Sequence, residues 1–158
     1  MTKRSATPAT FTIERTFPIS RDKVFRAYSD VKMKAKWFGG PEEWGRSEHK
    51  LDFRIGGRES VSGGPRGGPQ HHYNGIHMDI VPDERIVLAY DVVVGETRLT
   101  VSLGTTEFKV DGKGPNAGTR LVYTEQIVFL DAPEHLEDRK KGTEALFDNL
   151  VAALSKPH

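Results

Sequence analysis

The chain has 158 residues and no cysteine. Disulfide bonds, thiolate metal sites and cysteine nucleophiles are therefore excluded. The lack of cysteine fits a reducing compartment, so we expect a cytoplasmic location. A chain of this length favours a single domain. Such a domain buries roughly 70% of the surface that its unfolded chain exposes, which is enough for a core without covalent staples.

Neither sign of charge dominates, because 23 basic residues oppose 22 acidic ones. Nucleic-acid-binding domains more often carry a basic excess on one face, so we expect no nucleic-acid partner. No apolar run approaches the roughly 18 residues of a membrane span. The polar residues 1–10 lack the apolar segment of a signal peptide. We expect residues 1–9 to form a flexible N-terminus and residues 10–158 to form one soluble domain.

Several chemical signatures are also missing. The glycine-rich segment 63–68 lacks the Gly-Lys-Ser/Thr ending of a phosphate-binding loop and precedes a predicted strand. No Gly-x-Ser-x-Gly motif is present. The spacing of His71, His72 and His77 does not suit a metal site on one face of a strand. We therefore expect no metal and no cofactor, and the sequence shows no recognisable catalytic set.

The chain opens with a strand that is followed by two short helices. Phe11, Ile13 and Phe17 alternate with polar residues, which is typical of a half-buried strand. Ser20 and Asp30 stand where helix caps are needed, and we predict the second helix over residues 31–38. Glycines and a proline at positions 39–41 end that helix.

Residues 44–130 alternate in the manner of an antiparallel meander, with tight turns at positions 56–57 and 95–96. Each strand is expected to place its apolar residues on one face. The sets that share a face are Leu51, Phe53 and Ile55; Ile76, Met78 and Ile80; Ile86, Leu88, Tyr90 and Val92; Leu99, Val101 and Leu103; and Leu121, Tyr123, Ile127 and Phe129.

A long amphipathic helix is predicted over residues 133–155. Residues 131–134 resemble a capping box, and an apolar stripe recurs every 3.6 residues through Phe147 and Leu150. Glycine is unfavourable in the interior of a helix, so Gly142 needs another reason to stand there. We expect that reason to be close packing against the sheet. The order of elements predicts an α+β fold in which a curved antiparallel sheet holds this helix and leaves a pocket beside it.

Several motifs resemble those of the START-like (SRPBCC) superfamily, and within it of the family named after the activator of heat-shock-protein-90 ATPase. The resemblance covers nearly the whole chain after residue 10 and implies the helix-grip fold. The matching stretches are Phe17–Tyr28, Ala35–Phe38, Asp52–Gly57 (Asp-x-Arg-x-Gly-Gly), Tyr73–Val87, Gly118–Leu121 and the final helix with Gly142, Phe147 and Leu150.

The resemblance implies less about activity, because one fold hosts many functions. The superfamily includes lipid and hormone carriers, aromatase/cyclases and chaperone regulators. Three hypotheses stay open here: binding of a small hydrophobic or amphipathic molecule, catalysis by a cyclase, dehydratase or hydrolase in the same cavity, and regulation of a chaperone by protein contact. The eukaryotic activators carry an additional N-terminal domain for which 158 residues have no room. A homodimer is possible from the resemblance.

Aromatic residues near the expected cavity are candidate ligand contacts, although ordinary core packing is the alternative for each of them. They are Trp37, Phe38, Phe53, Tyr73 and Tyr90. His77 stands where the resembling family often has a tyrosine, so it is a candidate polar contact and a weak candidate for proton transfer.

Three charged residues complete the candidates. Arg54 and Arg98 are suited to anchor a ligand carboxylate or phosphate, and a structural ion pair, for Arg54 with Asp52, is the alternative. Either Glu125 or Gln126 faces inward, because neighbours in a strand alternate. An inward Glu125 with a raised pKa is a weak candidate for general acid or base catalysis. Its alternative is an ion pair with an arginine across the strand.

Overall fold

The computed structural model describes residues 4–45, 47–131 and 136–155. Strands dominate the middle of the chain, and a long helix follows them. In chain order the elements are β1 (Ala6–Phe17), α1 (Arg21–Ser29), α2 (Val31–Lys34), the 3-10 helix η1 (Glu42–Trp44), β2 (Glu48–Leu51), β3 (Arg58–Gly63), β4 (His71–Val81), β5 (Arg85–Val94), β6 (Thr97–Asp111), β7 (Gly118–Leu130) and α3 (Leu136–Ser155).

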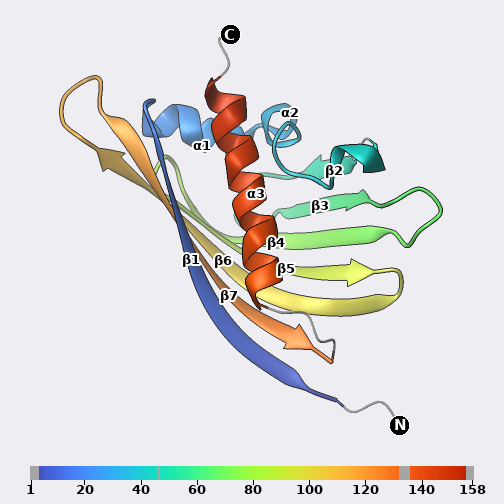
Figure 1. The fold of residues 1–158 in the computed structure, drawn as a ribbon. Coiled ribbons are helices and arrows are strands. Elements are labelled where there is room, and N and C mark those ends of the chain that lie inside the picture. The colour runs from blue at the N-terminus through green and yellow to red at the C-terminus, as the bar shows by residue number, and fades with distance from the viewer. Residues whose placement is uncertain (1–3, 46, 132–135, 156–158) are drawn as a thin grey trace.

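The seven strands of the described residues form one antiparallel sheet in the order β1-β7-β6-β5-β4-β3-β2. Strands β2 to β7 follow one another in the sheet as they do in the chain, whereas β1 pairs with β7 along its whole length. The sheet curls, and α3 crosses in front of its concave face (Figure 1). The short helices α1 and α2 lie near one end of that face. The predicted α+β helix-grip fold is confirmed.

β1 begins at Ala6, ahead of the domain boundary expected at residue 10. Its first residues are polar or small, so alternation alone did not reveal them as a strand. They pair with the end of β7, from Ala6 opposite Leu130 to Thr10 opposite Gln126. Backbone hydrogen bonding to a neighbouring strand therefore extends the element beyond its apolar pattern.

The two helices begin where the sequence predicts. Asp30 caps α2, because its Oδ1 accepts hydrogen bonds from the backbone nitrogens of Lys32 at 2.9 Å and Met33 at 3.4 Å. Ser20 occupies the N-cap position of α1, but its hydroxyl donates to Asp22 instead of bonding the helix backbone. α2 ends at Lys34, earlier than the predicted residue 38. Beyond Lys34 the backbone nitrogens of Lys36 and Trp37 bond to carbonyls three positions back, which is the tighter pattern of a 3-10 turn.

The predicted strand through Leu51, Phe53 and Ile55 is wrong beyond Leu51, where β2 ends. A turn over residues 52–57 replaces it, and the backbone nitrogen of Asp52 donates to the carbonyl of Arg58 at 2.9 Å. As a result Ile55 is 60% exposed, while Phe53 packs against the core.

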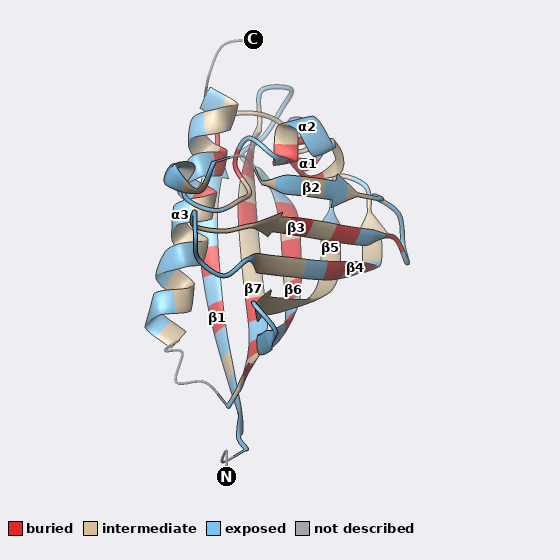
Figure 2. Ribbon diagram, turned by 90° about the vertical axis from the view of Figure 1, so that its right-hand side faces the viewer, coloured by how far each residue is buried: buried red, intermediate tan, exposed pale blue. Residues whose placement is uncertain are grey.

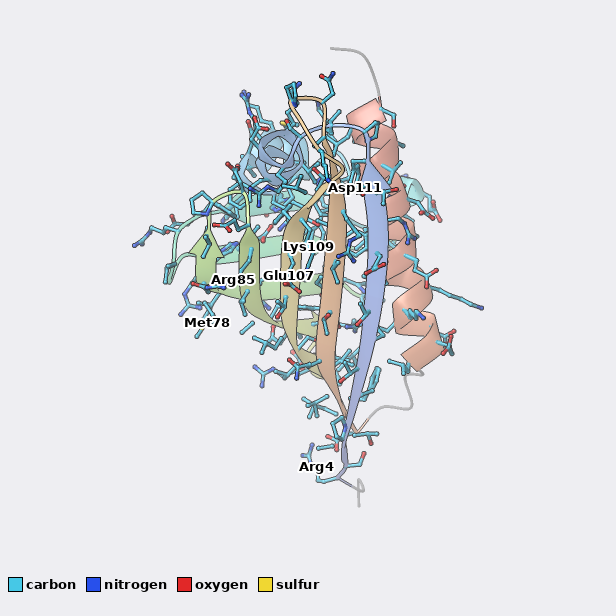
Figure 3. All side chains as sticks on the ribbon, turned by 90° about the vertical axis from the view of Figure 1, so that its left-hand side faces the viewer. Arg4, Met78, Arg85, Glu107, Lys109 and Asp111 are labelled. Atoms are coloured by element: carbon cyan, nitrogen blue, oxygen red, sulfur yellow. The ribbon has the colours of Figure 1, made fainter. Side chains whose placement is uncertain are left out.

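A β-bulge changes which residues of β4 face inward. The pairing with β5 shifts between His77 and Asp79, so one extra residue is inserted there. Ile80 packs against the core, but Met78 is 56% exposed. Figure 3 labels Met78 and Arg85 on the side of the sheet away from α3. The predicted common face of Ile76, Met78 and Ile80 is therefore wrong.

The inner face of β6 is small and polar, contrary to the expectation for Leu99, Val101 and Leu103. A register shift next to Val92 inserts an extra residue into β6, and Val101 and Leu103 are partly exposed. The buried residues of β6 are Thr100, Ser102, Gly104, Thr106 and Phe108. Only Phe108, at the far end of this row, is a large apolar residue.

The hydrophobic core gathers where α1 and α3 meet the inner faces of β1, β6 and β7. Figure 2 shows buried residues alternating with exposed or intermediate ones along these strands. Phe108 makes edge contacts with Phe25 and Tyr28, with ring centroids 5.3 and 5.2 Å apart. Phe147 and Leu150 are the buried residues of α3 in this cluster.

α3 presents its predicted apolar stripe to the sheet. The predicted capping box at residues 131–134 lies largely outside the described residues. Gly142 does not pack closely against the sheet as expected, because no heavy atom outside the adjacent backbone of α3 lies within 4 Å of the position that a Cβ would take. None of the described helices, α3 included, is both long and apolar enough to cross a membrane.

Candidate functional site

A cavity of about 450 Å³ lies between the inner face of the sheet, the segment after α1 and one side of α3. Aliphatic residues of β5 and nine aromatic side chains line it. The aromatic residues include all four tyrosines and both tryptophans of the chain. They are Tyr28, Trp37, Phe38, Trp44, Phe53, Tyr73, Tyr90, Tyr123 and Phe147.

Small residues on the sheet leave the space that these aromatic rings surround. Gly104 of β6 lies between Glu125 of β7 and Leu88 of β5 on the inner face. A Cβ at this position would lie 2.7 Å from the hydroxyl of Tyr123. The missing side chain therefore lets the Tyr123 ring lie over β6 at the edge of the cavity.

Six of the eight residues that the sequence suggested as ligand contacts line this cavity. They are Trp37, Phe38, Phe53, Tyr73, His77 and Tyr90. The rings of Tyr73 and Tyr90 lie 4.6 Å apart between centroids, and Phe38 meets Tyr73 edge-on at 4.9 Å. Contact of these six residues with a ligand stays a prediction.

Arg54 and Arg98 lie outside the cavity lining. Arg54 is 71% exposed and donates from Nε to Asp52 at 2.8 Å, which is the ion pair named as its alternative. Arg98 is 59% exposed and pairs with Asp91 at 2.9 Å. Arg54 stands in an exposed turn and Arg98 points outward from β6, so neither guanidinium reaches the inner face.

Glu125 faces inward and is fully buried, whereas Gln126 is exposed. Its carboxylate accepts hydrogen bonds from Tyr123 Oη at 2.7 Å, Ser102 Oγ at 2.9 Å and Arg139 Nη1 at 3.3 Å. The predicted ion pair with an arginine exists, but Arg139 comes from α3 and not from a neighbouring strand. This cluster joins the sheet to the helix beside the cavity.

Arg139 also reaches β6, because its Nη2 donates to Thr100 Oγ1 at 2.9 Å. Its side chain is only 13% exposed. Tyr90 lies nearby, and burial raises its pKa, with the negative charge of Glu125 raising it further. Burial likewise raises the pKa of Tyr123, and its tyrosine and Glu125 neighbours add to the rise. Both phenols therefore stay protonated hydrogen-bond donors at neutral pH.

A second buried polar cluster, centred on Glu59 of β3, was not found from the sequence. Lys34 Nζ lies 2.7 Å from Glu59 Oε1, and His49 Nε2 lies 2.6 Å from Oε2. Glu59 is 1% exposed and Lys34 is 4% exposed. Burial by itself raises the pKa of Glu59, but the Lys34 ammonium and the hydrogen bonds of His49 and Lys34 together outweigh it. The pKa is therefore lowered.

One sequence signal for this cluster was available. Glu59 and Val61 alternate with Arg58 and Ser60, which places Glu59 on the apolar face of its strand. No local signal pointed to Lys34, because it lies in a short, lysine-rich helix. Only the packing of α2 over β2 and β3 brings its ammonium to a buried carboxylate.

His77 is held by the Asp52–Gly57 turn. The backbone nitrogen of His77 donates to the Gly57 carbonyl at 3.0 Å, and its carbonyl accepts from the Gly56 nitrogen at 2.7 Å. Nδ1 of its ring also lies 3.2 Å from the Gly57 carbonyl. A Cβ at Gly57 would lie 2.0 Å from the carbonyl oxygen of Asp52, so only glycine allows this turn.

The electrostatic surroundings keep His77 neutral. Burial lowers its pKa, and the Gly57 carbonyl and Glu59 oppose this only in part. The ring of Phe53 packs edge-on against the imidazole, with 5.1 Å between centroids. Among the described residues, Tyr28 Oη and His49 Nδ1 are buried polar atoms that lack a hydrogen-bond partner.

Comparison with protein families identifies the chain. The sequence profile of the Activator of Hsp90 ATPase homolog 1-like protein family matches residues 18–155, which includes the whole cavity lining from Tyr28 to Phe147. The chain belongs to this family. The resemblance that its motifs suggested is confirmed. Among curated proteins, no sequence matches this chain significantly.

Two solved structures are similar to this protein over almost the whole chain. A protein of Rhizobium leguminosarum is 41% identical to this chain, and the two superpose with a TM-score of 0.90. The match spans 99% of this chain and 100% of the Rhizobium leguminosarum chain. The Mll3558 protein of Rhizobium loti is 38% identical over 94% of this chain and 99% of its own, with a TM-score of 0.84. CalU16 of Micromonospora echinospora shares only the fold, with 19% identity over 97% of this chain and 85% of its own and a TM-score of 0.62.

Within the described residues, no group of three or more histidine, aspartate or glutamate side chains has an arrangement that would hold a metal ion. The cavity of this chain is lined by aromatic rings and borders two buried clusters of charged side chains, one around Glu59 and one around Glu125.

Proposed function

We propose that this chain binds a small, largely apolar molecule in the cavity between its sheet and α3. The observation that carries the proposal is the cavity itself, which has about 450 Å³ and is surrounded by nine aromatic side chains. Ligand sites in proteins are typically concave, mostly apolar and roughly 300–1,000 Å³ in volume. Membership of the family supports the same reading, since its fold is one that holds ligands.

The two buried carboxylates, Glu125 and Glu59, favour binding over catalysis. Glu125 is engaged by Arg139, Ser102 and Tyr123, and Glu59 is engaged by Lys34 and His49. A general base needs a lone pair that faces the substrate. Carboxylates that already accept several hydrogen bonds act instead to position the side chains that line the cavity.

The family takes its name from activators of the Hsp90 ATPase. Regulation of a chaperone acts through a surface contact and requires no internal cavity, so the cavity favours a small molecule as the partner. A cytoplasmic location and a homodimer stay predictions.

Binding is tested with a matched pair of variants that add the same bulk inside and outside. Val92→Trp fills the cavity, because Val92 lines it. Val101→Trp adds a ring on the outer face, where Val101 is 42% exposed. The probe is N-phenyl-1-naphthylamine, an uncharged dye whose fluorescence rises in apolar surroundings.

We expect the wild-type chain and Val101→Trp to bind the dye equally, and Val92→Trp to bind it at least about tenfold more weakly. A tenfold change corresponds to about 1.4 kcal/mol, a modest loss for a site that has been filled. Equal binding by all three chains, or no binding by the wild type, would contradict the proposal. Native mass spectrometry of gently purified protein, before and after denaturation, then identifies any molecule that co-purifies.

A further inference from the structure

His77 presents a hydrogen-bond acceptor at the wall of the cavity. A carbonyl oxygen can only accept, so the contact of Nδ1 with the Gly57 carbonyl at 3.2 Å requires the proton on Nδ1. In a neutral imidazole the other nitrogen, Nε2, then carries a lone pair. Burial lowers the pKa of His77, which is consistent with the neutral form.

Among the described residues, no donor satisfies this Nε2 atom. Glu59 Oε1 lies 3.9 Å away, which is too far for a hydrogen bond, and it is itself an acceptor. That oxygen already accepts from Lys34 Nζ at 2.7 Å. The ring of His77 lines the cavity, so an occupant of the cavity can supply the missing donor.

The charges around the cavity favour an uncharged occupant. Glu59 is balanced by Lys34 at 2.7 Å, and Glu125 is balanced by Arg139 at 3.3 Å. Each buried cation therefore already has a buried anion. Asp138 also borders the cavity, but it is exposed to solvent. An anionic ligand would have to enter without a buried cation free to pair with it, at the desolvation cost of an unpaired buried charge.

We infer that the cavity takes an uncharged aromatic molecule that carries a hydroxyl group, and that this phenolic hydroxyl donates to Nε2 of His77. The inference rests on the proposed function and adds the chemical class of the ligand. Phe53 packs beside His77 with 5.1 Å between ring centroids, and Tyr73 lines the same cavity, so an aromatic ring finds aromatic partners there.

Three naphthalene probes test this class by isothermal titration calorimetry. 2-Naphthol carries a hydroxyl donor, 2-methoxynaphthalene keeps the oxygen but has no donor, and 2-naphthoate carries a negative charge. Because a buried hydrogen bond between neutral groups contributes about a factor of three to ten, we expect the wild type to bind 2-naphthol tighter than the methyl ether by that ratio. We expect 2-naphthoate to bind more weakly than either.

Two variants of His77 separate recognition from support of the turn. His77→Asn keeps a donor close to the position of Nδ1 for the Gly57 carbonyl but has no atom at the position of Nε2. His77→Gln places an amide oxygen near Nε2 and so retains an acceptor. The ratio of the two affinities should fall to about one in His77→Asn and recover in His77→Gln, while the methyl ether binds equally to all three chains. Thermal unfolding confirms that each variant is folded.

The outcomes are distinguishable from those of the proposed function. If N-phenyl-1-naphthylamine binds but 2-naphthol and its methyl ether bind equally, the proposed function stands and the phenol class is overturned. A ratio that persists in His77→Asn overturns it too, because another group or a bound water would then accept the hydroxyl. Preferential binding of 2-naphthoate rejects an uncharged ligand. Binding of none of the probes overturns both proposals.

Discussion

The two ends of strand β6 both face the interior of the protein, but one end lies in the packed core and the other borders the cavity. At one end of β6, Phe108 lies opposite Leu121 of β7, and both are at most 2% exposed in the packed core. Four residues earlier, Gly104 lies opposite Glu125, next to the cavity. Both positions point inward, so backbone geometry does not distinguish them.

The volume of the side chains makes the difference. At the core end the aromatic rings of Phe25, Tyr28 and Phe108 fill the space between α1 and the sheet. At the cavity end Ser102 and Gly104 leave that space open, and the ion pair of Glu125 with Arg139 connects the sheet to α3 instead. Close packing stabilises one end, and polar contacts around an opening support the other.

The largest expected effect comes from matched leucine substitutions at the two ends. Leu121→Ala should lower the free energy of unfolding by about 2–5 kcal/mol, because it opens a void in a packed region. Leu88→Ala should cost only about 1–2 kcal/mol, because Leu88 already borders the cavity and loses fewer contacts. Urea unfolding, followed by tryptophan fluorescence, measures both values. Equal losses would show that the cavity end is packed as tightly as the core.

Acid should destabilise the protein through the cavity end. The pKa of His77 is lowered from 6.5, so below that pH the unfolded chain binds a proton that the native chain does not. Its contribution to stability is therefore present above pH 6.5 and is lost as the pH falls through its lower native pKa. The lowered pKa of Glu59 acts with the same sign below its ordinary value of 4.5.

The variant His77→Gln isolates the first of these two losses. Its unfolding free energy should fall less than that of the wild type as the pH is lowered from 7 to about 5. Chemical denaturation across this range measures the two slopes. Parallel slopes in both chains would mean that His77 does not change its protonation on unfolding.

The smallest expected effect concerns Gly142, and Gly57 provides the contrast, because the surroundings of the two glycines are opposite. Gly142→Ala should stabilise the protein by up to about 1 kcal/mol, because alanine favours a helix interior and no heavy atom outside the adjacent backbone of α3 lies within 4 Å of the new Cβ. Gly57→Ala should destabilise it, because the Cβ would lie 2.0 Å from the Asp52 carbonyl oxygen. Thermal unfolding midpoints compare the pair. Destabilisation by Gly142→Ala would mean that α3 lies too close to its neighbours to admit the added methyl group.

Much of the fold was predictable because its signals are local. Each of these signals acts within a few residues and has its counterpart in the structure. They are the alternation in Phe11 to Phe17 and in Ile86 to Val92, the turn at positions 95–96 and the cap at Asp30. The faces of β4 and β6 were mispredicted. A bulge shifts the alternation by one residue, and nothing in the apolar pattern marks where it occurs.

The candidate site was predictable only in part. Tyr73 and Tyr90 followed from alternation within apolar strands, which also required either Glu125 or Gln126 to face inward. Trp37, Phe38 and Phe53 lie in turns or bends of the structure, beyond the ends of α2 and β2. The partners of the buried charges did not follow from alternation, since Lys34 meets Glu59 across 25 positions and Arg139 meets Glu125 from a different element. The residue type of Arg54 suggested an anchor for an anionic ligand, but the turn that contains it keeps its side chain on the surface beside Asp52.

The sequence by itself determined the class of the fold, the order of its elements and the aromatic character of its interior, because apolar periodicity, capping residues and turn glycines act locally. Only the tertiary structure decided where the interior is filled and where it is open. It also decided which charges are buried together, and that the Asp52–Gly57 turn sets the tautomer of His77. These features depend on distances between residues far apart in the chain, and only the packing of the folded chain sets those distances.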